Sequence, residues 1–155
     1  MGHQDSKRYV ATMGVEVMSI PFMVNGDIVL LDLWDTAGPE KFGGLRDGYY
    51  LSGSAAIAMF DVTARITYKN IPSWLRDIRR VCGDIPVVVV GNKVDMIKEH
   101  KKFNLKTFNK KNIPCFPVAV HCNYNIEKPF MHIFNTLFGS VQYCECLTKV
   151  ASPSK

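Results

Sequence analysis

Residues Asp35–Leu45 have the sequence DTAGPEKFGGL and directly follow an apolar run, Ile28–Trp34. An acidic residue followed by Thr-Ala-Gly at the carboxyl end of a strand is typical of a phosphate and magnesium site at the rim of an open α/β sheet. We expect Asp35 to hold the cation and Gly38 to offer its backbone N–H to a terminal phosphate. Pro39 comes next, where a side chain that orients a water molecule would be expected, and proline cannot do so.

A second motif, Asn92-Lys93-x-Asp95, follows the apolar run 85–90. A carboxylate can accept both N–H donors on the edge of guanine, whereas adenine offers no such pair, and each bond is worth roughly 1–3 kcal/mol. We expect Asp95 to read the base, Asn92 to brace the loop and the stem of Lys93 to lie over the base. Alone, four such residues could be a plain strand-to-helix turn; together with Asp35–Leu45 they indicate a nucleotide site.

Hydrophobic periodicity predicts the remaining elements. Strands are expected over 15–24, 28–34, 55–60, 85–90 and 115–119, and helices over 67–82, 103–111 and 127–138. Asn25-Gly26 predicts a hairpin turn between the first two strands. Buried strands that alternate with helices predict an α/β domain with a mostly parallel sheet over residues 1–139. Residues 140–155 show no periodicity and are expected to form a disordered tail.

The composition argues against two classes of partner. The 155 residues carry 19 basic and 14 acidic side chains, a net charge of +5 that is mild for a nucleic-acid binder. No apolar run reaches the roughly 18 residues of a membrane span. Six lysines fall close together, at positions 98, 101, 102, 106, 110 and 111. They form either a solvated helix face or a docking patch for an acidic protein partner.

The five cysteines are odd in number and include no C-x-x-C pair, which favours reduced, intracellular thiols. His121, Cys122, Cys144 and Cys146 could be taken as a metal set, but their spacing matches no standard zinc pattern. We therefore predict no zinc site.

Longer stretches around the two motifs resemble the small GTPases, and among them the Ran type that acts in nuclear transport. The resemblance runs from about Lys7 to Gly139. The residues that carry it are RYVATMGVEV (8–17), EKFGGLRDGYY (40–50), YKNIP (68–72) with Trp74, and NYN (123–125) with EKPF (127–130). Other small GTPases share the two short motifs but not these flanks.

This resemblance implies a small-GTPase fold, a three-layer α/β sandwich of the P-loop NTPase kind, with GTP or GDP and Mg²⁺ as cofactors. Thr12 would bind the magnesium and the γ-phosphate, Asp35 would hold the magnesium through water, and Gly38 would contact the γ-phosphate. Asn92, Lys93 and Asp95 would read guanine.

The resemblance also implies partners and a location. The partners would be nuclear transport receptors of the importin and exportin type, an exchange factor and a GTPase-activating protein. The protein would be found in the nucleus and the cytoplasm.

Three departures from the family pattern affect the expected chemistry. The first strand, the GxxxxGK[ST] phosphate loop and the first helix are not found in these 155 residues, and four lost charge-assisted hydrogen bonds would cost about 6–12 kcal/mol of binding. Pro39 stands at the position of the catalytic glutamine, so no catalytic residue is assigned. Residues 119–121, Ala-Val-His, align with the Ser-Ala-Lys of the guanine loop. We expect neither tight nucleotide binding nor GTP hydrolysis.

Three hypotheses remain open. The chain is a Ran-like GTP-binding protein with defective nucleotide binding, a non-catalytic module that competes for Ran partners, or an inert degenerate copy. In the family the first strand lies between the strands expected at 28–34 and 55–61. Without it, the sheet either closes the gap or stays split, and we predict marginal stability.

Overall fold

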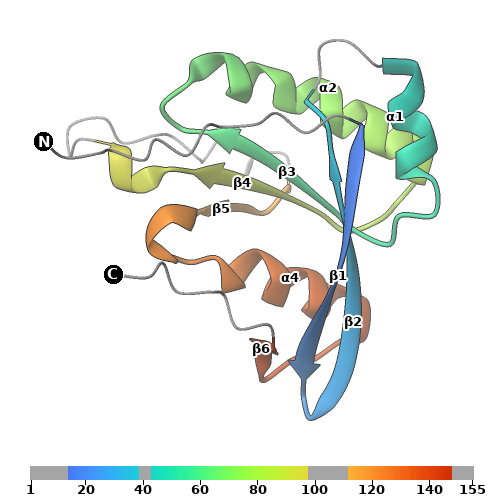
Figure 1. The fold of residues 1–155 in the computed structure, drawn as a ribbon, viewed down its shortest axis with the longest axis vertical. Helices are drawn as coiled ribbons and strands as arrows, with labels where there is room; N and C mark the ends of the chain where they lie inside the picture. Colours follow the sequence, from blue (N-terminus) through green and yellow to red (C-terminus); the bar gives the residue numbers. More distant parts are fainter. Residues whose placement is uncertain (1–13, 39–42, 98–111, 148–155) are drawn as a thin grey trace, which may run out of the picture.

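The computed structural model describes residues 14–38, 43–97 and 112–147 (Figure 1). Its helices are α1 (Gly43–Tyr50), α2 (Arg65–Cys82) and α4 (Glu127–Phe138), with short 3₁₀ turns η1 (Val94–Met96) and η2 (Val120–Cys122). Its strands are β1 (Val15–Val24), β2 (Asp27–Thr36), β3 (Ala56–Asp61), β4 (Val87–Asn92), β5 (Cys115–Pro117) and β6 (Cys144–Cys146). The α/β class is confirmed. The helix expected over 103–111 and the six clustered lysines lie outside the described residues.

Within residues 14–38, 43–97 and 112–147, the strands form two separate sheets of three strands each. The order is β2-β1-β6 in an antiparallel sheet and β3-β4-β5 in a parallel one. Of the two alternatives, the sheet therefore stays split. Within the described residues, β2 and β3 are each the last strand of their sheet, so each has one edge without a strand partner.

The β1–β2 hairpin follows from its turn and its alternation. Asn25 and Gly26 both have positive φ, 50° and 97°, as the two-residue turns of hairpins require. Side chains alternate between two faces along β1, so that Phe22 and Val24 are buried on one face. The opposite face carries exposed apolar side chains from both strands, among them Leu30 and Trp34 on β2.

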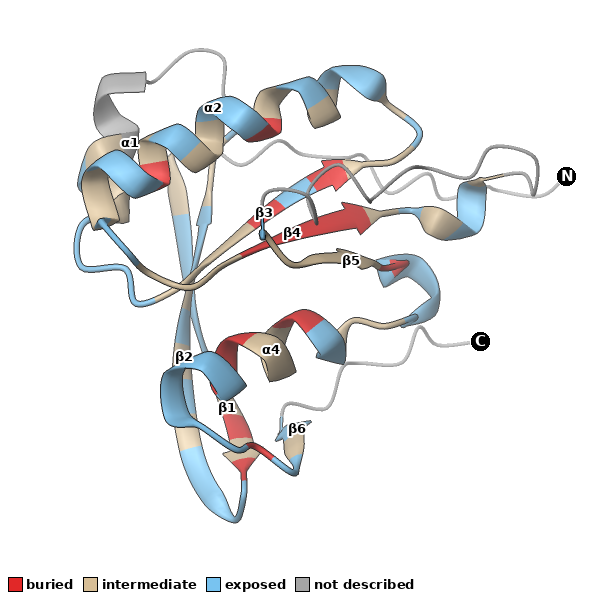
Figure 2. Cartoon of the chain, turned by 180° about the vertical axis from the view of Figure 1, so that it is seen from behind, coloured by how far each residue is buried: buried red, intermediate tan, exposed pale blue. Residues whose placement is uncertain are grey.

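The parallel sheet is covered by a helix on each face. Val89 points to α2, where it packs with Ile71, while Val88 and Val90 pack with Ile133 of α4. Figure 2 shows these buried segments in red along β3, β4 and the inner side of α4. The continuous valine run of β4 is thus explained by burial on both faces.

Helix α4 joins the two sheets. Ile133 packs against the parallel sheet, whereas its neighbour Phe134 packs with Phe22 and Val24 of the hairpin. The rings of Phe22 and Phe134 meet edge to face, with their centroids 5.2 Å apart. No described helix is long and apolar enough to cross a membrane.

The chain after α4 differs from the disordered tail expected from its sequence. Cys144–Cys146 pair with β1 as β6, and Val141 is buried beside Phe134. The side chain of Asn25 holds the segment in place. Its Oδ1 accepts the N–H groups of Gln142 (2.8 Å) and Tyr143 (3.2 Å), and its Nδ2 donates to the carbonyl of Ser140 (2.8 Å). A three-residue strand is too short to show periodicity, which is why the sequence did not reveal it.

Candidate functional site

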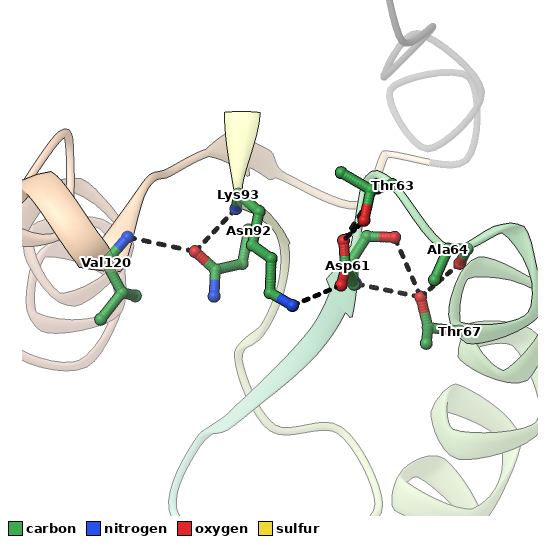
Figure 3. A network of polar contacts seen from close by, with 7 residues as sticks. All are labelled: Asp61, Thr63, Ala64, Thr67, Asn92, Lys93 and Val120. Carbon is green, nitrogen blue, oxygen red and sulfur yellow. Dashed lines mark hydrogen bonds and ion pairs between the residues drawn. The ribbon is translucent and has the colours of Figure 1, made fainter. Parts of the chain in front are cut away.

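The candidate site lies at the carboxyl ends of β3 and β4, where polar residues of three segments meet (Figure 3). Asp61 ends β3, Asn92 ends β4, and the two are partners in the parallel register. The carboxyl ends of parallel strands are where α/β sheets bind ligands. The register therefore brings both residues to the edge where such a site is expected.

Asn92 braces two loops with one amide oxygen. Its Oδ1 accepts the backbone N–H of Lys93 at 2.8 Å and that of Val120 at 3.1 Å. The second bond connects the end of β4 to η2, which contains two of the three residues aligned with the Ser-Ala-Lys loop. Asn92 thus fixes the spacing between the two loops that the sequence assigns to guanine.

Lys93 turns back toward the parallel sheet. Its backbone is left-handed, with φ of 67°, a conformation that is uncommon outside glycine. Its Nζ lies 2.7 Å from Oδ2 of Asp61, and this ion pair joins a side chain that is 54% exposed to one that is 20% exposed. The sequence predicts that the stem of Lys93 lies over a base. In the structure the ammonium group of Lys93 forms an ion pair with Asp61.

Asp61 is the residue of this site that sequence reasoning missed. Its Oδ1 accepts the N–H of Thr63 at 2.8 Å and the hydroxyl of Thr63 at 2.6 Å. The hydroxyl of Thr67 accepts the N–H of Asp61 at 3.0 Å and donates to Ala64 at 2.7 Å. Asp-x-Thr directly after a buried strand is the signal that could have identified this turn.

The charge of Asp61 is stabilised by its neighbours. Partial burial acts to raise the pKa of its carboxyl, but the Lys93 ammonium and the two donors of Thr63 act against it, so that the pKa lies below its ordinary value. Asp61 is therefore ionised at neutral pH and keeps Lys93 engaged.

The other predicted residues are distributed over both sheets. Asp95 lies in the first turn of η1, with its side chain exposed. Asp35 stands opposite Glu16 in the hairpin, and Gly38 follows the end of β2, where the N–H of Ala37 donates to Gly14 at 2.8 Å. The expected guanine residues thus belong to the parallel sheet and the expected phosphate residues to the antiparallel one. Thr12 and Pro39 lie outside the described residues.

A bound Mg²⁺ requires a cluster of ligands, and a bound nucleotide requires polar groups that are available to it. Among residues 14–38, 43–97 and 112–147, no three His, Cys, Asp or Glu side chains gather closely enough to hold a metal ion. The Val120 N–H and the Lys93 ammonium are both engaged within the protein, and the carboxylate of Asp95 faces solvent. As arranged, this set does not fit a tightly held nucleotide.

A comparison with protein families gives one finding. The sequence model described as the Ras family matches residues 3–138, which is most of the chain. The match includes both motifs and all the polar residues of Figure 3.

Proposed function

Since this chain belongs to the Ras family, whose members are small GTP-binding proteins that bind GTP or GDP with Mg²⁺, we propose that it is a Ran-like protein of nucleocytoplasmic transport that works by binding other proteins. Its affinity for guanine nucleotides is weak and it does not hydrolyse GTP. Its partners are the importin-type and exportin-type receptors, and it occupies the same compartments, nucleus and cytoplasm. The exchange factor and the GTPase-activating protein of the family are secondary partners.

One observation carries the proposal of weak nucleotide binding. The polar groups assigned to the base are already bonded to one another, through Lys93 to Asp61 and through Val120 to Asn92. The partly exposed ion pair is worth about 1 kcal/mol, which a nucleotide must offset in order to engage Lys93. Asp95 alone then discriminates guanine, which is worth roughly 1–3 kcal/mol and is far from tight binding.

The exposed face of the hairpin supports the part of the proposal that concerns protein partners. Val17 and Trp34 are cross-strand partners, and Leu30 lies on the same face; all three are about half exposed or more, with Leu30 at 68%. Asp32, which accepts the hydroxyl of Ser19, lies between Trp34 and Leu30 on this face. Exposed large apolar side chains gathered on one face, with polar residues among them, are typical of a protein-binding surface. The Ran-type stretch 40–50 begins just beyond β2.

Nucleotide affinity is the first test. The purified 155-residue chain is titrated with fluorescent GDP and GTP analogues in the presence of Mg²⁺. We expect dissociation constants weaker than micromolar, and Asp95→Ala should remove any preference for guanine over adenine. Guanine-specific binding at micromolar or tighter concentrations would overturn the proposal and restore a nucleotide switch.

Receptor binding is the second test. An importin-type receptor should retain the wild-type chain, and Leu30→Glu should abolish retention because it replaces the most exposed of the three apolar side chains with a charge. Ile66→Glu is the matched control, since Ile66 is equally exposed but lies on α2. If no transport receptor retains the wild-type chain, the alternative of an inert degenerate copy is correct.

A further inference from the structure

We propose that Cys144 and Cys146 form a two-thiolate site for a soft monovalent cation of the Cu(I) class. The site lies on β6, on the side of the molecule where the chain returns to the hairpin. The nucleotide motifs take no part in it, so it stands independently of the function proposed above.

The pairing of β6 with β1 places both thiols on one face. Cys144 pairs with Val24 and Cys146 with Phe22, and paired residues of antiparallel strands point to the same side. That side is the buried face of the hairpin, and Cys144 packs at the margin of the apolar cluster of Phe22 and Val24. Glu145, between the cysteines, points to the opposite face and accepts the hydroxyl of Tyr143.

Both thiols can be reached from solvent to a different degree. Cys146 is exposed and Cys144 half-buried, and both are thiols in the structure. A ligand from solvent can therefore reach the pair at the Cys146 end.

The backbone that carries the two thiols is fixed. Asn25 bonds to residues 140, 142 and 143 just before β6, and its own N–H donates to the carbonyl of Tyr143 at 3.0 Å. Beyond β6, the N–H of Leu147 donates to the carbonyl of Pro21 at 2.9 Å. Both ends are thus anchored to the hairpin, and the thiols need no large backbone rearrangement to receive an ion.

The spacing favours an ion between the sulfurs over a bond between them. Two residues of antiparallel strand rise about 6.8 Å, the upper limit of the Cα separation in disulfides, whose usual value is nearer 5.5–6 Å. Two metal–sulfur bonds of about 2.3 Å each let the sulfurs stand up to roughly 4.6 Å apart, which the strand accommodates. An internal disulfide would require β6 to be distorted; a bridging ion would not.

The number and type of ligands select the ion. Among the described residues no third His, Cys, Asp or Glu completes a metal cluster, so a four-ligand zinc site is not provided. Hard ions such as Mg²⁺ and Ca²⁺ require oxygen ligands. Soft thiolates favour Cu(I), which two thiolates can bind in a linear arrangement; binding forms two copper–sulfur bonds and releases the two thiol protons to solvent.

Competition with a Cu(I) chelator tests the site. Without oxygen, the 155-residue chain is titrated against the Cu(I)–bicinchoninate complex, and loss of the colour of the complex reports transfer. We expect one Cu(I) per chain. Cys144→Ser and Cys146→Ser should each weaken binding about 100-fold or more, since the second ligand acts intramolecularly. Cys122→Ser is the matched control, removing an exposed thiol elsewhere, and should bind as the wild type does.

A second measurement needs no variant. Bound Cu(I) should protect Cys144 and Cys146, but not Cys122, from alkylation, as read by peptide mass spectrometry. Equal binding by the serine variants, protection of other cysteines only, or one copper shared by two chains in gel filtration would each overturn the proposal. Failure to withdraw copper from the chelator at equal concentrations of protein and metal would overturn it as well.

Discussion

At the scale of single residues, Asp61 organises the candidate site. It receives Thr63 at one carboxylate oxygen and Lys93 at the other, and its own N–H is bonded to Thr67. One side chain therefore connects the end of β3, the start of α2 and the loop after β4. The stability of the whole chain should therefore depend on whether Asp61 is ionised.

Acid should weaken the chain in part through Asp61. Because its folded-state pKa is lowered, its contribution is complete above the ordinary aspartate pKa of about 3.9 and is lost as pH falls through the lower folded value. Asp61→Asn should cost about 1 kcal/mol at pH 6, and the cost should shrink as the pH falls below the ordinary aspartate pKa, measured by urea unfolding. Asp84→Asn removes a fully exposed carboxylate paired with Arg79 and should leave the stability unchanged over this pH range. An Asp61→Asn cost that does not depend on pH would contradict the assignment.

The sequence predicted some residues of the site and missed others for a physical reason. The short polar motif after a buried valine run led from the sequence to Asn92 and Lys93, two residues of the network in Figure 3. The pairing of Lys93 with Asp61 was not predicted, since it depends on the register between β3 and β4, which periodicity does not fix. The bond from Val120 to Asn92 likewise joins segments that only the fold brings together.

At the scale of elements, the hairpin turn is also the anchor of the C-terminal segment. Asn25 both adopts the positive φ of the turn and bonds to three residues beyond α4. Asn-Gly predicted the first role, and the strands predicted over 15–24 and 28–34 lie close to the observed bounds of β1 and β2. The second role could not be predicted, because β6 has only the three residues Cys-Glu-Cys.

Two substitutions separate the roles of Asn25. Asn25→Gly keeps the positive φ and removes the side-chain hydrogen bonds, while Asn25→Ala loses both. We expect Asn25→Gly to cost about 2–3 kcal/mol of unfolding free energy, with three bonds of about 1 kcal/mol each, and Asn25→Ala to cost about 1 kcal/mol more. Hydrogen exchange should show residues 141–147 losing protection in both. Undisturbed protection of this segment in Asn25→Gly would show that β6 is held by other means.

Helix α4 should be the described element whose side-chain truncation costs the most stability. Phe134 is buried against Phe22 and the hairpin, so Phe134→Ala should cost about 3–5 kcal/mol. Leu137→Ala, on the more exposed side of the same helix, should cost less than about 1 kcal/mol. Thermal unfolding followed by circular dichroism would compare them, and equal losses would mean that α4 does not hold the hairpin through Phe134.

At the scale of the whole molecule, the division into two sheets sets the stability. Strands β2 and β3 each have one edge without a strand partner among the described residues. The backbone N–H and C=O groups on these edges can pair with another chain. Met59 is 44% exposed although β3 is otherwise a strand of buried type. We expect marginal stability, and a cooperative melt well above body temperature would contradict this.

Association through the β3 edge can be tested with one charge. Met59→Lys should slow aggregation at 37 °C several-fold, because lysine on an edge strand opposes pairing with a second chain. Met96→Lys adds the same charge at an exposed position of η1, away from the edge, and should leave the rate unchanged. Light scattering measures both, and equal slowing by the two variants would assign the effect to net charge alone.

The packing of α4 between the two sheets determines what tryptophan fluorescence can report about this chain. Its two tryptophans are divided between the sheets: Trp34 lies on β2 of the hairpin, and Trp74 lies on α2 against the parallel sheet. Each sheet therefore carries its own intrinsic fluorophore: Trp34 is half-exposed, and Trp74 is partly buried against a core cluster. Thermal unfolding followed by tryptophan fluorescence would report on the parallel sheet in Trp34→Phe and on the hairpin sheet in Trp74→Phe. The difference between the two midpoint temperatures would measure how strongly the adjacent residues Ile133 and Phe134 of α4 couple the sheets.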